Sequence, residues 1–109
     1  MPIRRIAQVI EVKPDRIEDY ERIHRAVWPE VLSIIHACSI RNYSIFRHGV
    51  MLVAYFEYVG DDYEADMARM AADPKTREWW THTDPMQQPV PDHAAGEWWH
   101  PIREVFHTD

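Results

Sequence analysis

Stretches rich in β-branched and aromatic residues predict the strands of this chain. The first covers residues 3–12, where one face is apolar apart from Gln8. Two more cover residues 41–47 and 50–58. His48-Gly49 lies between them and fits a tight hairpin, because glycine adopts positive φ at little cost. A closing strand is predicted over residues 102–107.

In the segment after the first strand, apolar residues recur every three to four positions, which is the spacing of a helix. This pattern runs from Ile17 to Ile35, with charged residues on the opposite face. Pro14 is suited to the first turn of such a helix. Pro29 lies inside the pattern, so we expect a kink or a break near Trp28.

Two further helices are predicted after the hairpin. Asp61 or Asp62 caps the first of them, whose apolar stripe contains Met67 and Met70. Asp73-Pro74 begins a short second helix that ends in Trp79-Trp80. Residues 83–101 contain four prolines together with Asp, Gly and His, which predicts a loop.

The resulting order, β-α-β-β-α-β, predicts an α+β fold of the ferredoxin-like type, with one antiparallel sheet and helices on one face. The chain of 109 residues is about the size of one domain, so we expect a single domain over residues 1–109. The other sheet face would be left uncovered, although the strands carry apolar residues on both faces. We therefore expect a homodimer of the dimeric α+β-barrel type.

Composition and charge narrow the function classes. The formal net charge of −6, with 12 basic against 18 acidic residues, argues against a nucleic-acid or anionic-membrane partner. The longest apolar run, residues 50–56, is far shorter than the roughly 20 residues of a membrane span. The single cysteine, Cys38, has no partner for an intrachain disulfide, and we expect a cytoplasmic protein.

Known cofactor and metal motifs are missing from the sequence. The three glycines are too scattered for a phosphate-binding loop, no Gly-x-Ser-x-Gly turn is present, and the seven histidines show no specific metal-ligand spacing. We therefore expect neither a cofactor nor a metal.

The remaining candidates for chemistry are a histidine among aromatic residues and a tryptophan pair. Tyr20, His24 and Trp28 follow one another at four-residue steps and so share a helix face. A histidine exchanges protons near neutral pH. A core histidine satisfied by backbone groups is the simpler interpretation, but the polar tip of Tyr20 beside it favours a cleft. Trp79 and Trp80 diverge by about 100° on a helix, so one can pack while the other faces a cavity.

Together these residues resemble the L-rhamnose mutarotase family. The resemblance rests on Tyr20-Glu-Arg-Ile-His24, on Trp28-Pro-Glu, on Arg41-Asn-Tyr-Ser-Ile, on Trp79-Trp80 followed by Thr83-Asp-Pro-Met, and on Glu104-Val-Phe. It implies a small dimeric enzyme that interconverts the anomers of a 6-deoxy-hexose without a cofactor. It also implies that His24 is the catalytic acid/base, and that the sugar is contacted by Tyr20, Tyr43, Trp79 and Trp80.

Two departures from the family pattern leave the sugar open. The segment from Gln87 to Trp99 differs from the family's usual loop, and the hairpin at His48-Gly49 looks shorter than the common form. L-Fucose therefore competes with L-rhamnose as the substrate. From other classes, the alternatives are a dimeric haem-degrading or oxygenase-type protein, which has the same topology, and a non-catalytic binding dimer.

Overall fold

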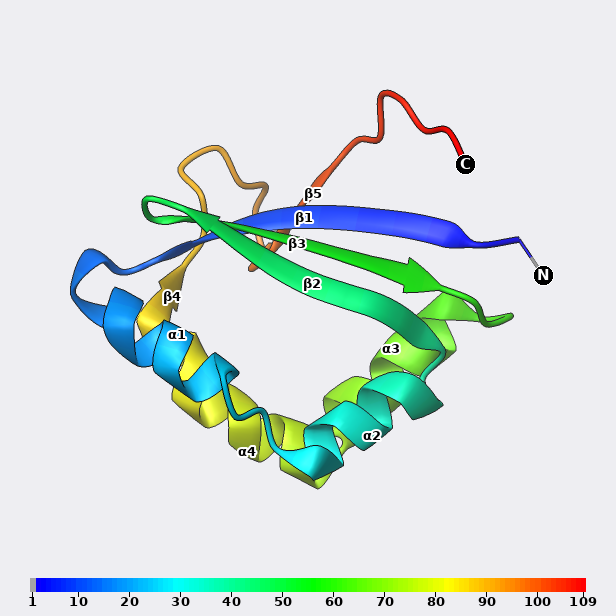
Figure 1. Cartoon of the computed structure of the whole chain (residues 1–109), viewed down its shortest axis with the longest axis horizontal. Coiled ribbons are helices and arrows are strands. Elements are labelled where there is room, and N and C mark those ends of the chain that lie inside the picture. The colour runs from blue at the N-terminus through cyan, green and yellow to red at the C-terminus, as the bar shows by residue number, and fades with distance from the viewer. Residues whose placement is uncertain (1) are drawn as a thin grey trace.

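The computed structural model describes residues 2–109, as a curled antiparallel sheet with helices on one of its faces (Figure 1). The strands are β1 (Arg4–Val12), β2 (Ile40–His48), β3 (Met51–Tyr58), β4 (Gln87–Gln88) and β5 (His100–Ile102). The helices are α1 (Ile17–His24), α2 (Pro29–Ala37), α3 (Tyr63–Ala72) and α4 (Pro74–Thr83), with short 3₁₀ turns at Pro14–Arg16 and Asp84–Met86.

The sheet has the strand order β2-β3-β1-β4, and β5 also pairs with β1. All pairs are antiparallel, and the β1–β3 register runs from Arg4 opposite Tyr58 to Glu11 opposite Met51. β4 pairs with residues 11–12 of β1, while β5 pairs with residues 7–9. The last strand of the predicted ferredoxin-like fold is thus divided into two short pieces along one edge, and the fold class is confirmed.

The predicted helix boundaries follow local chemistry. α1 ends at His24 and α2 begins at Pro29, which confirms the expected break. The Asp62 carboxylate accepts a hydrogen bond from the backbone N–H of Ala65 at the start of α3. The Asp73 carboxylate does the same for Thr76 at the start of α4, over 2.9 Å. α4 continues three residues beyond Trp80, to Thr83, so the predicted end of this helix was too early.

The inner face of the sheet, which points toward the helices, carries the core. Along β3, Leu52, Ala54, Phe56 and Tyr58 are at most 4% exposed. Leu52 and Ile10 of β1 pack with Val12, Tyr20 and Met86 in one buried cluster. The strand predicted over residues 50–58 is confirmed at Met51–Tyr58, and buried and partly open positions alternate along it.

β2 contains an irregularity that the sequence pattern did not reveal. Its register with β3 shifts between Arg41 and Ser44, where one extra residue is accommodated. Asn42 has a φ of 53°, and asparagine is one of the few residues other than glycine that tolerates this conformation. The bulge reverses the alternation of β2 and places the Tyr43 ring 5.4 Å from that of Phe56, on the inner face.

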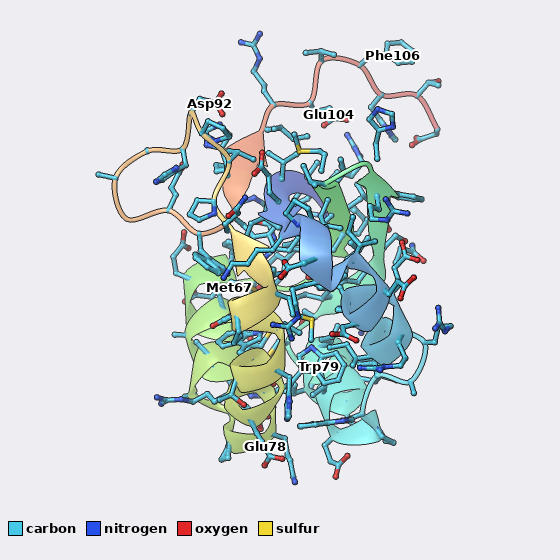
Figure 2. All side chains as sticks on the ribbon, turned by 90° about the vertical axis from the view of Figure 1, so that its left-hand side faces the viewer. Met67, Glu78, Trp79, Asp92, Glu104 and Phe106 are labelled. Carbon is cyan, nitrogen blue, oxygen red and sulfur yellow. The ribbon has the colours of Figure 1, made fainter. Side chains whose placement is uncertain are left out.

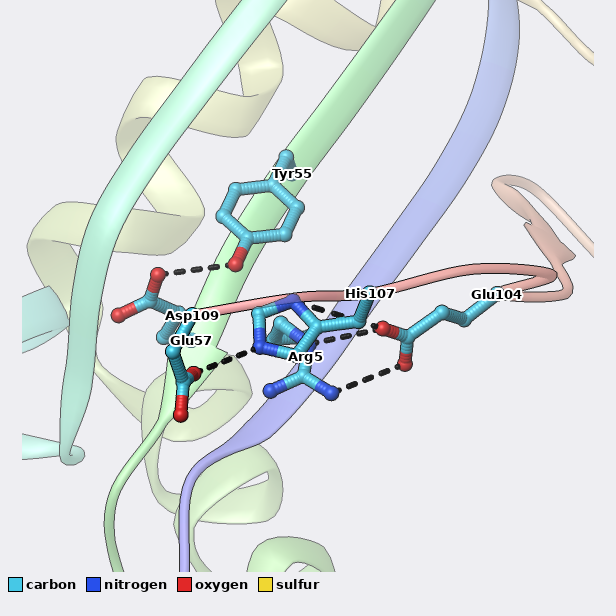
Figure 3. A network of polar contacts seen from close by, with 6 residues as sticks. All are labelled: Arg5, Tyr55, Glu57, Glu104, His107 and Asp109. Atoms are coloured by element: carbon cyan, nitrogen blue, oxygen red, sulfur yellow. Dashed lines mark hydrogen bonds and ion pairs between the residues drawn. The ribbon is translucent and has the colours of Figure 1, made fainter.

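The C-terminal segment differs from its prediction. The expected strand over residues 102–107 is wrong except at Ile102, because β5 ends there and residues 103–109 have no regular structure. These residues leave the edge of β1 and lie over the outer face, opposite the helices (Figures 1 and 3). The Glu104 carboxylate accepts a 2.9 Å hydrogen bond from Arg5 there. The outer face is therefore covered in part by this chain, contrary to the expectation of an uncovered face.

The long segment 83–101 is less irregular than predicted. It contains β4 and part of β5, whose two and three residues were too short to stand out from the loop residues around them. In addition, no helix within residues 2–109 has the length and apolar character needed to cross a membrane.

Candidate active site

α1 brings Tyr20 and His24 together on the side that faces the sheet. The two residues lie one helical turn apart, and their rings stack with centroids 4.1 Å apart. Tyr20 is 4% exposed and belongs to the core cluster. The helix ends directly after His24, because the chain must adopt an extended conformation at Trp28 before Pro29.

The hydrogen bond of His24 fixes its tautomer. Its Nδ1 lies 2.7 Å from the backbone carbonyl oxygen of Tyr20, and a carbonyl can only accept. Nδ1 therefore carries the proton in the neutral ring, and Nε2 keeps its lone pair free. Burial lowers the pKa of His24 below that of an ordinary histidine, and the bond to Tyr20 opposes this to a smaller degree. At neutral pH the ring is uncharged and can accept a proton at Nε2.

The Tyr20 hydroxyl is held in its neutral form. Burial is the largest cause of the raised pKa of Tyr20, with a smaller contribution from the nearby Tyr43 phenol. The hydroxyl oxygen accepts a 3.2 Å hydrogen bond from Nε2 of Gln87. Because one lone pair of this oxygen is occupied, the phenolic proton remains available to an acceptor.

Tyr43 of β2 approaches the site from the sheet, close enough to Tyr20 for its phenol to affect the pKa of that residue. Burial raises the pKa of its hydroxyl to about 12, yet 38% of the residue is exposed. Protein surrounds the hydroxyl group, while solvent reaches the rest of the side chain. A partly exposed side chain whose hydroxyl lies deep in the molecule is typical of a site that admits a small polar ligand.

Trp79 closes the aromatic cluster from α4 (Figure 2). It is 7% exposed, and its ring meets His24 edge-on with centroids 5.5 Å apart. Trp28 lies against Trp79 at 5.2 Å and against His82 at 5.6 Å. The rings of Tyr20 and Trp79 against His24 limit its contact with bulk water, which agrees with its lowered pKa.

Trp80 takes a different position from its neighbour. It is 37% exposed and lines an open depression of ≈ 500 Å³ on α4, together with Arg77, Thr81 and Asp84. Within the described chain it makes no ring contact with His24 or Trp79. The structure thus brings together Tyr20, His24 and Trp79, with Tyr43 nearby, and does not bring Trp80 into this cluster. The assignment of Trp80 to the sugar stays a prediction.

Gln87 is the residue at this site that sequence reasoning missed. It was assigned to a loop, and a glutamine in a proline-rich segment gives no signal of burial. In the structure it forms β4 and is 5% exposed, with hydrogen bonds on both ends of its amide. As for metals, residues 2–109 contain no group of three histidine, cysteine or acidic side chains placed to hold an ion.

Comparison with known proteins gives a consistent picture. A family model described as L-rhamnose mutarotase matches residues 5–108. A protein of Opitutus terrae named L-rhamnose mutarotase is 35% identical, over 96% of this chain and 98% of its own length. A protein of Xanthomonas campestris named L-fucose mutarotase is 36% identical, over 97% of this chain and 89% of its own length.

A solved structure shares the fold. The L-rhamnose mutarotase of Formosa agariphila superposes with a TM-score of 0.77 at 23% identity, covering 97% of this chain and 99% of that one. At this level of identity the likeness supports the ferredoxin-like arrangement described above. The family model and the two relatives carry more than the fold, because they match the chain in sequence over nearly its whole length, the relatives at 35% and 36% identity.

Proposed function

Because the chain belongs to the L-rhamnose mutarotase family, we propose that it interconverts the α and β anomers of a 6-deoxy-hexose, with L-rhamnose as the first candidate. It is therefore an isomerase that opens and recloses a sugar ring. The relative from Xanthomonas campestris makes L-fucose the alternative substrate. The family match favours this reaction over the haem-degrading class that has the same topology.

The tautomer of His24 is the observation that carries the mechanism. With Nδ1–H bound to the Tyr20 carbonyl, the free lone pair of Nε2 accepts the proton of the anomeric hydroxyl. The bond between the anomeric carbon and the ring oxygen then breaks, and the ring oxygen takes up a proton. The open aldehyde rotates about the adjacent carbon–carbon bond. Closure on its other face returns a proton from His24 to the new anomeric hydroxyl.

We assign the second proton to Tyr20. Its hydroxyl is neutral and buried, and its oxygen accepts a hydrogen bond from Gln87. The hydroxyl proton is therefore available to the ring oxygen of the sugar. When the ring recloses, the open-chain hydroxyl returns this proton to the phenolate, and the enzyme is restored. The phenol is a weak acid, so its proton moves as the electrons of the breaking bond reach the ring oxygen.

Trp79 and Tyr43 contact the sugar in this proposal. The ring of Trp79 provides a flat apolar surface for the C–H face of a pyranose, and the Tyr43 hydroxyl provides a hydrogen bond. Trp80 contacts the sugar only if the sugar reaches the depression beside Arg77, which makes its role the weakest of the set.

The first experiment is magnetisation-exchange NMR on the anomeric protons of L-rhamnose and L-fucose, with and without the protein. Faster exchange for L-rhamnose supports the proposal, and preferential exchange for L-fucose supports the alternative. No acceleration of either sugar contradicts the proposed activity. Haem added to the same protein should produce no Soret band, and such a band would support the oxygenase class instead.

We also propose that the protein is a cytoplasmic homodimer joined through the outer face of the sheet. Phe46 of β2 is 62% exposed there, and Val105 and Phe106 of the C-terminal segment are 85% and 78% exposed. Association with a second copy would remove this apolar surface from water, which favours a dimer. Sedimentation velocity at micromolar concentration tests the dimer, and a monomer would contradict it. The buried single cysteine fits a reducing compartment, which cell fractionation tests.

A further inference from the structure

A chain of two hydrogen bonds connects the proposed site to the segment that departs from the family pattern. The indole Nε1–H of Trp98 donates to Oε1 of Gln87 over 3.3 Å. Nε2 of the same amide donates to the Tyr20 hydroxyl over 3.2 Å. Gln87 is 5% exposed and Tyr20 is 4% exposed, so the inner bond is shielded from water. The mechanism above uses Tyr20 and the bond that it accepts from Gln87, but it gives Trp98 no role and does not say what fixes the direction of that bond.

The direction of both bonds is fixed by chemistry. An indole N–H can only donate, so it must face the carbonyl end of the amide. The amide nitrogen then faces Tyr20, and an amide nitrogen can only donate. The Tyr20 oxygen is therefore an acceptor toward Gln87, and its own proton must point away from that residue.

The indole of Trp98, which donates the first of these two hydrogen bonds, is held in place by its neighbours. Glu97 accepts hydrogen bonds from the backbone N–H of Ala94 and from the His100 ring, each over 2.7 Å. Trp99 packs against the buried cluster that contains Tyr20. Trp98 is thus fixed between a closed turn and an anchored tryptophan, although it is 38% exposed itself.

We propose that Gln87 is a positioning residue that, oriented by Trp98, directs the hydroxyl proton of Tyr20 toward the sugar. This inference rests on the proposed function. It gives the segment from Gln87 to Trp99 a second role besides any contact with the substrate, because it sets the direction of a catalytic hydrogen bond. It also accounts for a buried glutamine in a short edge strand.

Gln87→Glu reverses the bond while retaining the size of the side chain. A carboxylate accepts hydrogen bonds from both Trp98 and Tyr20, so the tyrosine proton turns away from the sugar. We expect kcat for anomer exchange to fall by about tenfold or more, the scale of one lost hydrogen bond, with a smaller change in KM. As the pH falls and the introduced carboxyl is protonated, it regains a donor. The ratio of variant to wild-type kcat should then rise.

Two other variants distinguish the effect of the direction of the Gln87 hydrogen bond from the effect of the packing of its side chain. Gln87→Met fills the same space without any donor, so its loss of kcat should show no recovery at low pH. Gln88→Met is the matched control, because Gln88 is exposed and its amide donates only to Glu11. This control should have wild-type kcat and KM. Equal ratios of Gln87→Glu and Gln87→Met to wild type at every pH would overturn the proposal.

A measurement without sugar tests the hydrogen bonds themselves. In ¹H–¹⁵N spectra, the side-chain amide signals of Gln87 should shift in Trp98→Phe and again in Tyr20→Phe. Trp98→Phe should lower kcat in the wild-type background and have no further effect in Gln87→Met. Unshifted amide signals, or additive losses of kcat in the double variant, would contradict the proposed pair of hydrogen bonds from Trp98 through Gln87 to Tyr20. An inactive wild-type protein with shifted amide signals would instead contradict the proposed function alone.

Discussion

On β3, the side chains of the inner face are at most 4% exposed, whereas on the outer face of the adjacent β2 strand Phe46 is 62% exposed. The polar groups differ in the same way. On the inner side, the partly buried His24 and the buried Tyr20 each have one directed partner. On the outer side, Arg5 pairs with Glu104, and Glu57 accepts hydrogen bonds from Asn42 and Tyr55, in contact with solvent.

This difference allows one sheet to hold both the proposed site and the proposed association surface. A buried bond with a fixed direction sets the tautomer of a histidine, because no water competes for its lone pair. An exposed ion pair sets no tautomer and is screened by salt. Changes to the inner face should therefore affect catalysis and folding, and changes to the outer face should affect association.

The largest effect is expected for His24→Ala. The loss of the proposed base should lower the anomer-exchange rate by about 10²–10⁴-fold, while the circular dichroism spectrum stays that of a folded protein. The matched control is His36→Ala, which removes an exposed histidine of α2 and should leave the rate unchanged. Full exchange activity in the folded His24→Ala variant would show that another group is the base.

Leu52→Ala and Phe46→Ala compare the two faces directly. Leu52 is 1% exposed, so its truncation should lower the free energy of unfolding by about 2–5 kcal/mol. Phe46→Ala should change the stability of the monomer by only about 0.5 kcal/mol or less. Urea denaturation at several protein concentrations measures both. A concentration-dependent loss confined to Phe46→Ala would locate the dimer on the outer face.

The pH dependence of kcat tests the role of His24 on the inner face. The proposed base must be neutral, and burial lowers the pKa of His24. kcat should therefore stay constant at neutral pH and fall on the acid side only below the ordinary histidine value of about 6.5. The stability linked to His24 is fully present above about 6.5 and is lost as the pH falls through the lowered folded pKa. An acid limb at or above 6.5 would contradict this assignment.

Asn42 tests whether the bulge delivers Tyr43 to the inner face. Asn42→Val forces a β-branched residue to a φ of 53° and should lower the free energy of unfolding by about 1–2 kcal/mol, with weaker sugar binding. Asn42→Gly adopts this conformation freely and should retain KM, although it loses the 2.9 Å hydrogen bond to Glu57. Similar KM values for both variants would separate Tyr43 from the bulge.

The smallest effect is expected for Glu104→Gln. This change removes the charge that Arg5 binds, and both side chains are partly exposed. The loss of stability should be slight at low salt and vanish at high salt, because the exposed pair is screened. Hydrogen exchange of residues 103–109 should increase at low salt. A large, salt-independent loss would mean that the C-terminal segment is part of the core.

The elements that the sequence predicted are those with a local chemical cause. β-Branched and aromatic residues predicted β3, two aspartate caps predicted α3 and α4, and Pro29 predicted the break after α1. Helical spacing alone placed Tyr20 and His24 on one face, whereas Trp79 was assigned to the same site only through the family resemblance. The divergence of Trp79 and Trp80 followed from helix geometry in the same way.

The features that were missed depend on distant partners. β4 and β5 are strands only because β1 offers an edge to pair with. Val105 and Phe106 have strand-forming side chains, but Glu104 binds Arg5 on the outer face and the chain leaves the edge. Gln87 is buried because Tyr20 and Trp98 satisfy its amide, and no local pattern around residue 87 reports those partners.

The bulge at Asn42 has a consequence for the behaviour of the protein at high concentration. β2 is an edge strand of the sheet, and a long regular edge is a template for pairing with other chains. The extra residue interrupts the row of free backbone groups. The feature that aims a tyrosine inward should therefore also hinder the pairing of this edge with other chains. Regularising β2 by deleting Asn42 would remove both properties at once.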